Sequence, residues 1–333
     1  MSNSNKDKLT LSALILMIFT SVFGFNNIPR AFYLMGYSAI PWYIFSAIFF
    51  FLPYAFMMAE FGAAFRKETG GIYTWMNKSV GPRYAFVGTF MWYSSYLIWM
   101  VSVSSSIWVP FSNLLFGKDT TSTWSLFGLS PATTLGILGS IFVIFITFIS
   151  SKGLKSIAKI ASIGGIFVTS ANLVLLIGGL IVLVANKFKL AEPLDINAIT
   201  KSPNPFYQTP LGILGFLVFA LFAYGGLEAV GGLVDSTENP EKTFPKGVKI
   251  AAIVIGIGYS LAILFEGFFI NWNSVLKGGD VNMANVSYIV IKNLGIEIGK
   301  AFNLSENTIN LLGSLFARYI GLAGNNDEEL VQA

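Results

Sequence analysis

The chain alternates long apolar stretches with shorter polar ones, and each long stretch is about as long as a membrane crossing. A helix needs roughly 20 apolar residues to cross about 30 Å of hydrocarbon. An additional stretch, from about Ile309 to Asn325, falls short of that length. The full-length stretches are Leu9 to Met35, Pro41 to Phe65, Tyr84 to Leu115, Pro131 to Ile149, Ile157 to Ala185, Pro210 to Val234 and Val248 to Ile270. The pattern predicts an all-α integral membrane protein.

Composition agrees with the pattern and removes several classes of function. The 333 residues are 54% hydrophobic and 11% charged, with a mean hydropathy of +0.67. Cysteine and histidine are absent, which excludes disulfides, Cys/His metal sites and histidine proton relays. We therefore expect no cofactor. Few acids or bases lie in the apolar stretches and no G-x-S-x-G elbow is present, so we do not expect an enzyme.

Charge predicts the orientation of the chain in the membrane. The net charge of +4 is modest and its basic residues are scattered, so a nucleic-acid partner is not expected. Lysines and arginines are more frequent in the connections on the side of the N-terminus, including Arg66, Lys67 and Lys152. The positive-inside rule then predicts a multi-pass plasma-membrane protein with a cytoplasmic N-terminus. Asn271 to Asn307 is predicted to be a long external connection with short surface helices.

The first apolar stretch is interrupted where a membrane helix is deepest, by the sequence "SVFGFNNIPRAF" from Ser21 to Phe32. Gly24 lets the chain leave helical geometry, and Pro29 lacks a backbone N–H. Unpaired backbone groups cost several kcal/mol each in lipid, so such a break needs protein, water or a ligand to satisfy it. The alternative is a simple proline kink, which is our interpretation of Pro53 in the second stretch.

The sixth stretch contains a second interruption, "FAYGGLEAVGG", from Phe222 to Gly232. Two glycine pairs flank Glu228, and a carboxylate at the bilayer centre costs about 2.5 to 3.5 kcal/mol on insertion scales. Tight helix packing is the alternative explanation for the glycines. It does not account for Glu228.

The two interruptions fall in the first and sixth spans, with four intact spans between them. Two five-span repeats, the second inverted, would place them in equivalent positions, which is typical of a transport site at the membrane midplane. Free N–H groups near Asn27 and Pro29 suit a carboxylate. Unwound carbonyls near Phe222, Ala223 and Tyr224 suit an ammonium. A zwitterionic α-amino acid fits both ends.

At these residues the sequence resembles the amino acid/polyamine/organocation (APC) superfamily, and most closely its glutamate/γ-aminobutyrate antiporter branch. The resemblance extends to about Leu322 and is carried by "NNIPRAF", by "AEFGAAFRKETGGIYTW" from Ala59 to Trp75, and by "FAYGGLEAVGGLVDSTENPEKTFPKGV" from Phe222 to Val248. It implies a twelve-span, LeuT-like inverted-repeat fold. It also implies secondary active transport of amino acids by alternating access, through exchange or proton coupling.

The resemblance also implies roles for individual residues. Phe222 would be an aromatic gate over the substrate, with core packing as the alternative, and Glu228 would be a carboxylate linked to protonation and gating. The residues expected to bind substrate are Phe25, Asn26, Asn27 and Ile28 on the carboxylate side and Ala223, Tyr224 and Gly225 on the amino side.

Two further charged residues carry weaker expectations. Arg30 follows the first break and could pair with Glu228 or with a substrate carboxylate. Glu266 lies near the outer end of the seventh span, where an interfacial carboxylate needs no special function.

The chain departs from the family pattern after the seventh span. We divide it into a first five-span repeat at 1–186, an external loop at 187–208, a partial second repeat at 209–324 and a polar tail, "NNDEELVQA", at 325–333. About seven or eight of twelve spans are then present, which suggests a truncated reading frame. The sequence predicts a secondary transporter or its N-terminal portion. The alternatives are a non-transporting amino acid sensor, an assembly subunit, and a channel, although no pore ring is evident.

Overall fold

The computed structural model describes residues 8–65, 71–151, 154–234, 236–277 and 283–324. The polar tail at 325–333, the connection at 66–70 with Arg66 and Lys67, and Lys152 lie outside these residues. The elements are α1 (Leu11–Val22), α2 (Asn27–Met35), η1 (Gly36–Ser38), α3 (Ala39–Ser46), η2 (Ala47–Phe51), α4 (Leu52–Ala64), α5 (Gly71–Val80), α6 (Pro82–Ser106), α7 (Trp108–Phe116), η3 (Thr121–Thr123), α8 (Pro131–Ser150), α9 (Leu154–Ala185), α10 (Ile196–Thr200), η4 (Pro205–Gln208), α11 (Pro210–Phe222), η5 (Leu227–Leu233), α12 (Pro240–Glu266), η6 (Trp272–Leu276), α13 (Val286–Ala301) and α14 (Glu306–Gly324).

The prediction of an all-α membrane protein is confirmed. The described residues include six helical segments long and apolar enough to cross a membrane: Asn27–Ala64, Pro82–Phe116, Pro131–Ser150, Gly165–Ala185, Pro210–Ala229 and Pro240–Glu266. Two of them begin with a side-chain cap followed by proline. Ser130 Oγ accepts from the Thr133 N–H at 3.2 Å, and Thr209 Oγ1 accepts from the Gly212 N–H at 3.1 Å.

Several spans differ from the boundaries that hydropathy predicts. The seventh span begins at Pro240, eight residues before the predicted Val248. Its first two turns are helical but polar, so hydropathy does not detect them. The predicted third span is two helices, α6 and α7, which meet at Ile107 just before Pro110. In the second span the helix widens to a π-turn in η2 directly before Pro53, which accommodates the missing N–H of that proline.

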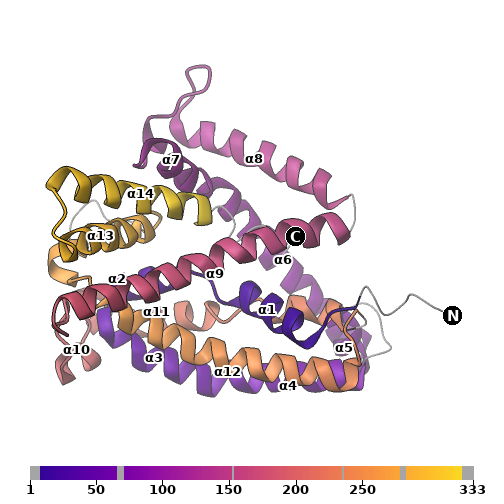
Figure 1. The fold of residues 1–333 in the computed structure, drawn as a ribbon. Helices are drawn as coiled ribbons and strands as arrows, with labels where there is room; N and C mark the ends of the chain where they lie inside the picture. The colour runs from indigo at the N-terminus through magenta and orange to yellow at the C-terminus, as the bar shows by residue number, and fades with distance from the viewer. Residues whose placement is uncertain (1–7, 66–70, 152–153, 235, 278–282, 325–333) are drawn as a thin grey trace.

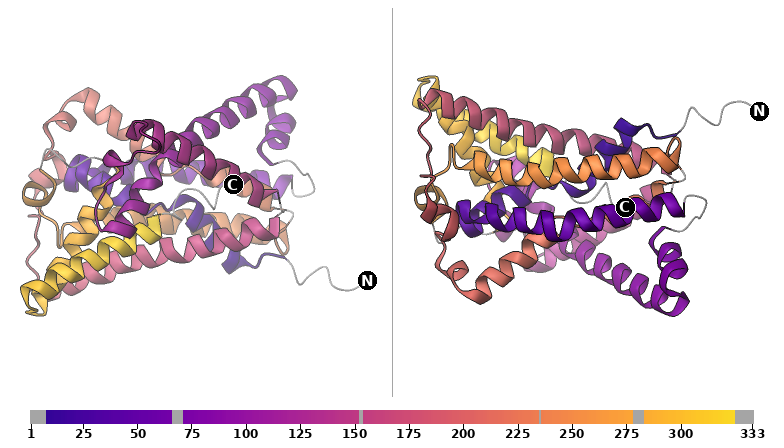
Figure 2. Two further views of the ribbon diagram at one scale, coloured as in Figure 1. Left: turned by 90° about the horizontal axis from the view of Figure 1, so that it is seen from above. Right: turned by 90° about the horizontal axis from the view of Figure 1, so that it is seen from below.

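Helix α12 lies at the centre of the fold. It packs along α4, α3, α1 and α2 and also against α9. Figure 1 shows α9 running between the α1–α12 layer and the α13–α14 pair, and Figure 2 shows the same layers from above and below. The connection from Asn271 to Asn307 was predicted to hold short surface helices. That prediction is wrong for α13, because its residues Val290 and Leu294 are fully buried.

The first and sixth spans are both broken, as predicted. The first separates into α1 and α2 around Phe23 to Asn26, and the sixth separates into α11 and the 3₁₀ helix η5 around Ala223 to Gly226. An isolated backbone bridge joins Leu9 to Thr237, so the start of the first span lies beside the end of the sixth. The two-repeat organisation stays a prediction.

Candidate functional site

The first break leaves backbone donors without acceptors. Helix α2 opens with two short hydrogen bonds, from the Asn27 N–H to the Gly24 carbonyl at 3.2 Å and from the Ile28 N–H to the Phe25 carbonyl at 3.1 Å. As a result, the N–H groups of Phe25 and Asn26 have no acceptor among the described residues. Two neighbouring N–H groups at the start of a helix suit an anion such as a carboxylate.

The second break leaves backbone acceptors without donors. The last turn of α11 closes with the Gly225 N–H donating to the Phe222 carbonyl at 2.9 Å. The carbonyl groups of Tyr224 and Gly225 then receive no hydrogen bond from the part of the chain that the structure describes. Gly226 has φ +104°, a left-handed conformation that glycine adopts without a steric cost. The turn therefore presents carbonyl oxygens, which suit an ammonium group.

One buried hydroxyl holds the two breaks together. Tyr259, on α12, lies with its Oη 2.9 Å from the Gly24 nitrogen, whose N–H donates to it, and 3.0 Å from the Ala223 carbonyl oxygen. The same Oη lies 2.8 Å from the Val22 carbonyl oxygen and 3.3 Å from Asn27 Nδ2. Sequence reasoning missed this residue because a tyrosine in an apolar span resembles ordinary core packing. The first break and the second consequently lie side by side at Tyr259.

Glu228 is held by a second set of hydrogen bonds. Its Oε2 accepts from the Tyr54 hydroxyl at 2.8 Å and from the Gly226 N–H at 3.2 Å. Its Oε1 accepts from the Tyr96 hydroxyl at 2.8 Å and from Trp92 Nε1 at 3.4 Å. Charge-assisted bonds of this kind are stronger than neutral ones. The carboxyl group thus fastens the sixth-span turn to α4 and α6.

Most of the other predicted site residues have side chains that are buried or hydrogen-bonded within the protein. Phe25, Ile28 and Ala223 are buried. Asn26 Oδ1 accepts from the Ser287 hydroxyl of α13 at 2.7 Å, and the Tyr224 hydroxyl donates to the Tyr43 carbonyl at 3.2 Å. What these residues offer at the breaks is therefore mainly backbone.

Phe222, the predicted gate, lies at the end of α11 with 64% of its side chain exposed. It continues an exposed apolar stripe along that helix, formed by Leu211, Leu214 and Val218. Its role as a gate stays a prediction.

For the two charged residues singled out earlier, the pairing of Arg30 with a substrate carboxylate stays a prediction, and the expectation for Glu266 is wrong. Arg30 Nε donates to the Met283 carbonyl at 3.1 Å, and Arg30 is not among the described donors to Glu228. Glu266 was predicted to be interfacial. That prediction is wrong, because its side chain is 0% exposed and packs inside the fold at the end of α12.

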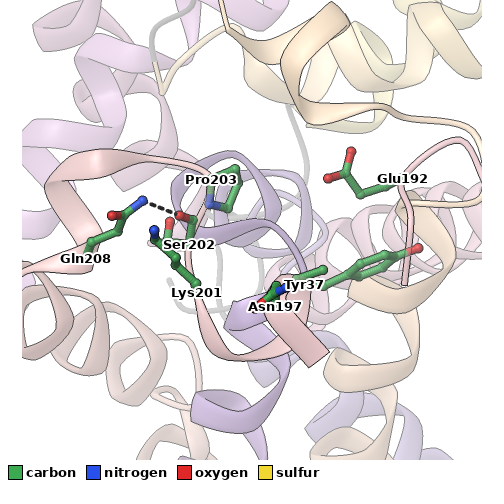
Figure 3. A pocket seen from close by; sticks show the side chains of 8 residues that line it. Tyr37, Glu192, Asn197, Lys201, Ser202, Pro203 and Gln208 are labelled. Carbon is green, nitrogen blue, oxygen red and sulfur yellow. Dashed lines mark hydrogen bonds between the residues drawn. The ribbon is translucent and has the colours of Figure 1, made fainter. Parts of the chain in front are cut away.

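A pocket of about 280 Å³ lies away from the breaks, at the connection between α9 and α11 (Figure 3). Its charged residues are Glu192 and Lys201. Burial raises the pKa of the Glu192 carboxyl, and the Trp272 N–H, which donates to Oε2 at 2.8 Å, partly offsets this rise. The full lining is Tyr37, Glu192, Asn197, Ala198, Lys201, Ser202, Pro203 and Gln208.

Two broken membrane helices that lie side by side and leave backbone groups free are typical of transporters. Residues 9–306 match the family model described as amino acid permease. The chain therefore belongs to the amino acid permease family, within the APC superfamily that the motifs resemble.

Relatives are named as transporters and permeases, which agrees with the expectation that the chain is not an enzyme. The chain is 57% identical to the inner membrane transporter YjeM of Escherichia coli (strain K12) over 316 residues, 95% of this chain and 63% of that protein. It is 26% identical to the aspartate/glutamate permease AcaP of Lactococcus lactis subsp. cremoris (strain MG1363), covering 88% of this chain and 58% of that protein. It is 27% identical to the probable agmatine/putrescine antiporter AguD of Lactococcus lactis subsp. lactis (strain IL1403), covering 82% of this chain and 54% of that protein. The chain thus spans less than two thirds of the length of these relatives.

Proposed function

We propose that the chain carries the substrate cradle of a secondary active transporter, which moves amino acids or related amines across the plasma membrane by alternating access. The proposal covers the chain as a transporter or as the N-terminal portion of one. The inner-membrane location in the name of the E. coli relative supports the choice of membrane. The predicted cytoplasmic N-terminus belongs to the same proposal.

The observation that carries the proposal is the meeting of the two breaks at Tyr259. Its hydroxyl oxygen is within 3.0 Å of both the Gly24 nitrogen and the Ala223 oxygen. Beside it, the free N–H groups of Phe25 and Asn26 would hold the substrate carboxylate. The free carbonyls across the gap would hold its ammonium. Backbone recognition of the α-amino acid core leaves the substrate side chain to other contacts.

We therefore propose amino acids as the substrate class, and we include related amines as further candidate substrates. Names of two relatives point the same way, since one is called an aspartate/glutamate permease and the other a probable agmatine/putrescine antiporter. Substrate would enter under Phe222 acting as the gate.

Glu228 is proposed as the group that links protonation to the gate. As a carboxylate it accepts four hydrogen bonds from the sixth-span turn, α4 and α6. A protonated carboxyl has fewer acceptor positions. Protonation would therefore loosen the turn that presents the ammonium-binding carbonyls, and this links proton binding to substrate release.

A binding screen tests the proposal. The purified 333-residue chain in detergent is titrated with acidic, basic and neutral amino acids, agmatine and putrescine at two pH values, beside Glu228→Gln. We expect saturable binding of at least one amino acid or amine, with a pH dependence that is smaller in Glu228→Gln. Absence of binding by every compound would contradict the cradle.

Reconstitution into liposomes separates the alternatives that the sequence left open. Saturable exchange of the bound compound supports a transporter complete in this chain. Binding without flux supports the N-terminal portion of a transporter or a sensor subunit.

A further inference from the structure

Glu266 is a carboxyl group buried where charge is costly and where the proposed cradle does not use it. It is the last residue of α12, its side chain is 0% exposed, and both of its carboxylate oxygens have no hydrogen-bond partner among the described residues. An isolated ionised carboxylate in a low-dielectric interior is strongly disfavoured unless a cation joins it. The position therefore calls for a positive partner.

Further hydroxyls without partners lie in the second span and in α12, which pack against each other. We call the contact between these two elements from Tyr37 to Tyr43 the Tyr37–Tyr43 seam. The hydroxyls of Tyr37, Tyr43 and Ser46 are buried without partners, as is that of Ser260. Two close approaches of the backbone show how the second span and α12 are aligned. A Cβ built at Gly256 would lie 3.4 Å from the Ala47 side chain, and one built at Gly267 would meet the Tyr37 hydroxyl. Tyr43 and Ser46 lie between these two contacts on α3, which packs against α12, and Tyr43 lies within electrostatic range of Glu266.

The seam connects the pocket to the two breaks. At one end the side chain of Tyr37 lines the pocket that also holds Glu192 and Lys201 (Figure 3). At the other end the Tyr43 ring packs on the ring of Tyr259, with centroids 5.2 Å apart. Buried polar rows of this kind are the places where proteins hold water or ions.

The titratable groups around Glu266 are Tyr37 of η1, Tyr43 of α3, Tyr259 of α12 itself, Tyr224, which packs on Tyr43, and Glu192 and Lys201 at the pocket. Other elements packed on this end of α12 contribute Gly179 of α9, which faces Phe265 and Phe269, and Asn293 of α13, which donates to the Phe269 carbonyl. No lysine or arginine forms an ion pair with Glu266 in the described part of the chain.

The chemistry of this set favours a proton over a metal ion. Alkali and alkaline-earth ions take several oxygen ligands, often more than one carboxylate. Among the described residues no group of three or more acidic, histidine or cysteine side chains gathers. One carboxyl among neutral hydroxyls needs one charge, and a proton supplies it with a single O–H bond.

We propose that Glu266 is a proton-binding site, reached from the pocket along the Tyr37–Tyr43 seam and coupled through Tyr43 and Tyr259 to the broken spans. The carboxylate takes a proton from hydronium in water that enters the pocket, which leaves a neutral carboxyl and a water molecule. At higher pH the carboxyl returns the proton to water along the same route. The role of this site in the protein rests on the proposed transport function. Protonation of Glu266 itself can be measured without transport.

Infrared difference spectroscopy of the purified 333-residue chain tests the site. The C=O stretch of a protonated carboxyl is recorded as the pH is lowered, without substrate. We expect a band in the wild-type chain that Glu266→Gln removes and Glu266→Asp retains. Glu192→Gln and Glu228→Gln are the matched controls, and both should keep that band. Tyr43→Phe, a milder change, should shift its frequency because a hydroxyl near the carboxyl is lost.

Other outcomes overturn the proposal. A spectrum of folded Glu266→Gln that matches wild type would show that Glu266 does not bind the proton. If Glu266→Gln does not fold, an unshifted band in Tyr43→Phe overturns the coupled seam. Loss of the band on replacing choline chloride by sodium chloride at fixed pH would assign the site to a metal cation. A band with no amino acid binding in the screen would instead contradict the cradle and leave the proton site standing.

Discussion

The Tyr259 hydroxyl lies 2.9 Å from the Gly24 nitrogen, across 235 positions of sequence, and accepts its N–H in the middle of the first break. The same oxygen lies 3.0 Å from the Ala223 carbonyl oxygen. A single atom of the seventh span therefore fixes the distance between the two interrupted spans. Loss of that atom should affect stability and substrate binding together.

Tyr259→Phe removes the hydroxyl and keeps the ring. We expect a loss of roughly 2 kcal/mol in the free energy of unfolding, because buried backbone groups at Gly24 and Ala223 lose a partner. Substrate affinity should fall about tenfold or more. Tyr224→Phe is the control, since its described hydrogen bond goes only to the Tyr43 carbonyl. Equal losses of affinity in the two variants would contradict the special position of Tyr259.

The bond between Tyr96 and Glu228 is expected to couple the third span to the sixth. In a double-mutant cycle of Tyr96→Phe and Glu228→Gln, we expect a coupling of about 1 kcal/mol in the free energy of unfolding, as for a partly buried hydrogen bond to a charged group. Unfolding is followed in mixed detergent micelles. Tyr93→Phe, on an exposed position of the same helix, should be additive with Glu228→Gln. Additivity in both cycles would rule out the proposed contact.

Gly226→Ala tests the turn of the sixth span. The φ of +104° is strained for any residue with a Cβ, so we expect a loss of about 1 kcal/mol or more in stability. Gly215→Ala is the matched control, since a Cβ built there meets nothing within 4 Å. In the middle of α11 that change should be neutral or stabilise by up to about 1 kcal/mol. The unfolding midpoint in detergent measures both variants.

Glu192→Gln should make stability less dependent on pH. Burial raises the folded-state pKa of Glu192 above its ordinary value of 4.5, so the folded chain binds this proton more tightly than the unfolded chain. The native state then loses stability as the pH rises from the ordinary pKa of Glu192 through its raised folded-state pKa. Glutamine does not titrate and can still accept from the Trp272 N–H.

The measurement is the unfolding midpoint of both chains at about pH 4 and about pH 7. The variant should match wild type at the lower pH and exceed it at the higher pH. A difference of the same size at both values, or of opposite sign, would contradict the assignment.

Much of the fold follows from local patterns. Apolar length predicts the spans, including the two helix starts at Pro131 and Pro210 that the structure confirms. Gly24 with Pro29 and the glycine pairs around Glu228 predict the two breaks. These features depend on short-range sterics and hydrogen bonding, which neighbouring residues in the chain decide.

The boundaries of α12 and the division at Ile107 were not predicted correctly. Helices continue through polar residues such as Lys242 and Lys246, and hydropathy does not register them. The partners of the site were also missed. Tyr54, Tyr96 and Tyr259 are tyrosines in aromatic-rich spans, and their distance in sequence from Glu228 and Gly24 gives no local signal.

The sequence by itself determined that two membrane spans come apart, because glycine and proline act on their own turns. It did not determine which backbone groups are freed. The Asn27 N–H and the Phe222 and Ala223 carbonyls, which were predicted to be free, all have partners. Only the tertiary structure decided that Tyr259 joins the two breaks, that four donors hold Glu228, and that Glu266 is buried rather than interfacial. Those outcomes depend on how helices far apart in the chain pack side by side, which sets which hydroxyl reaches which backbone group.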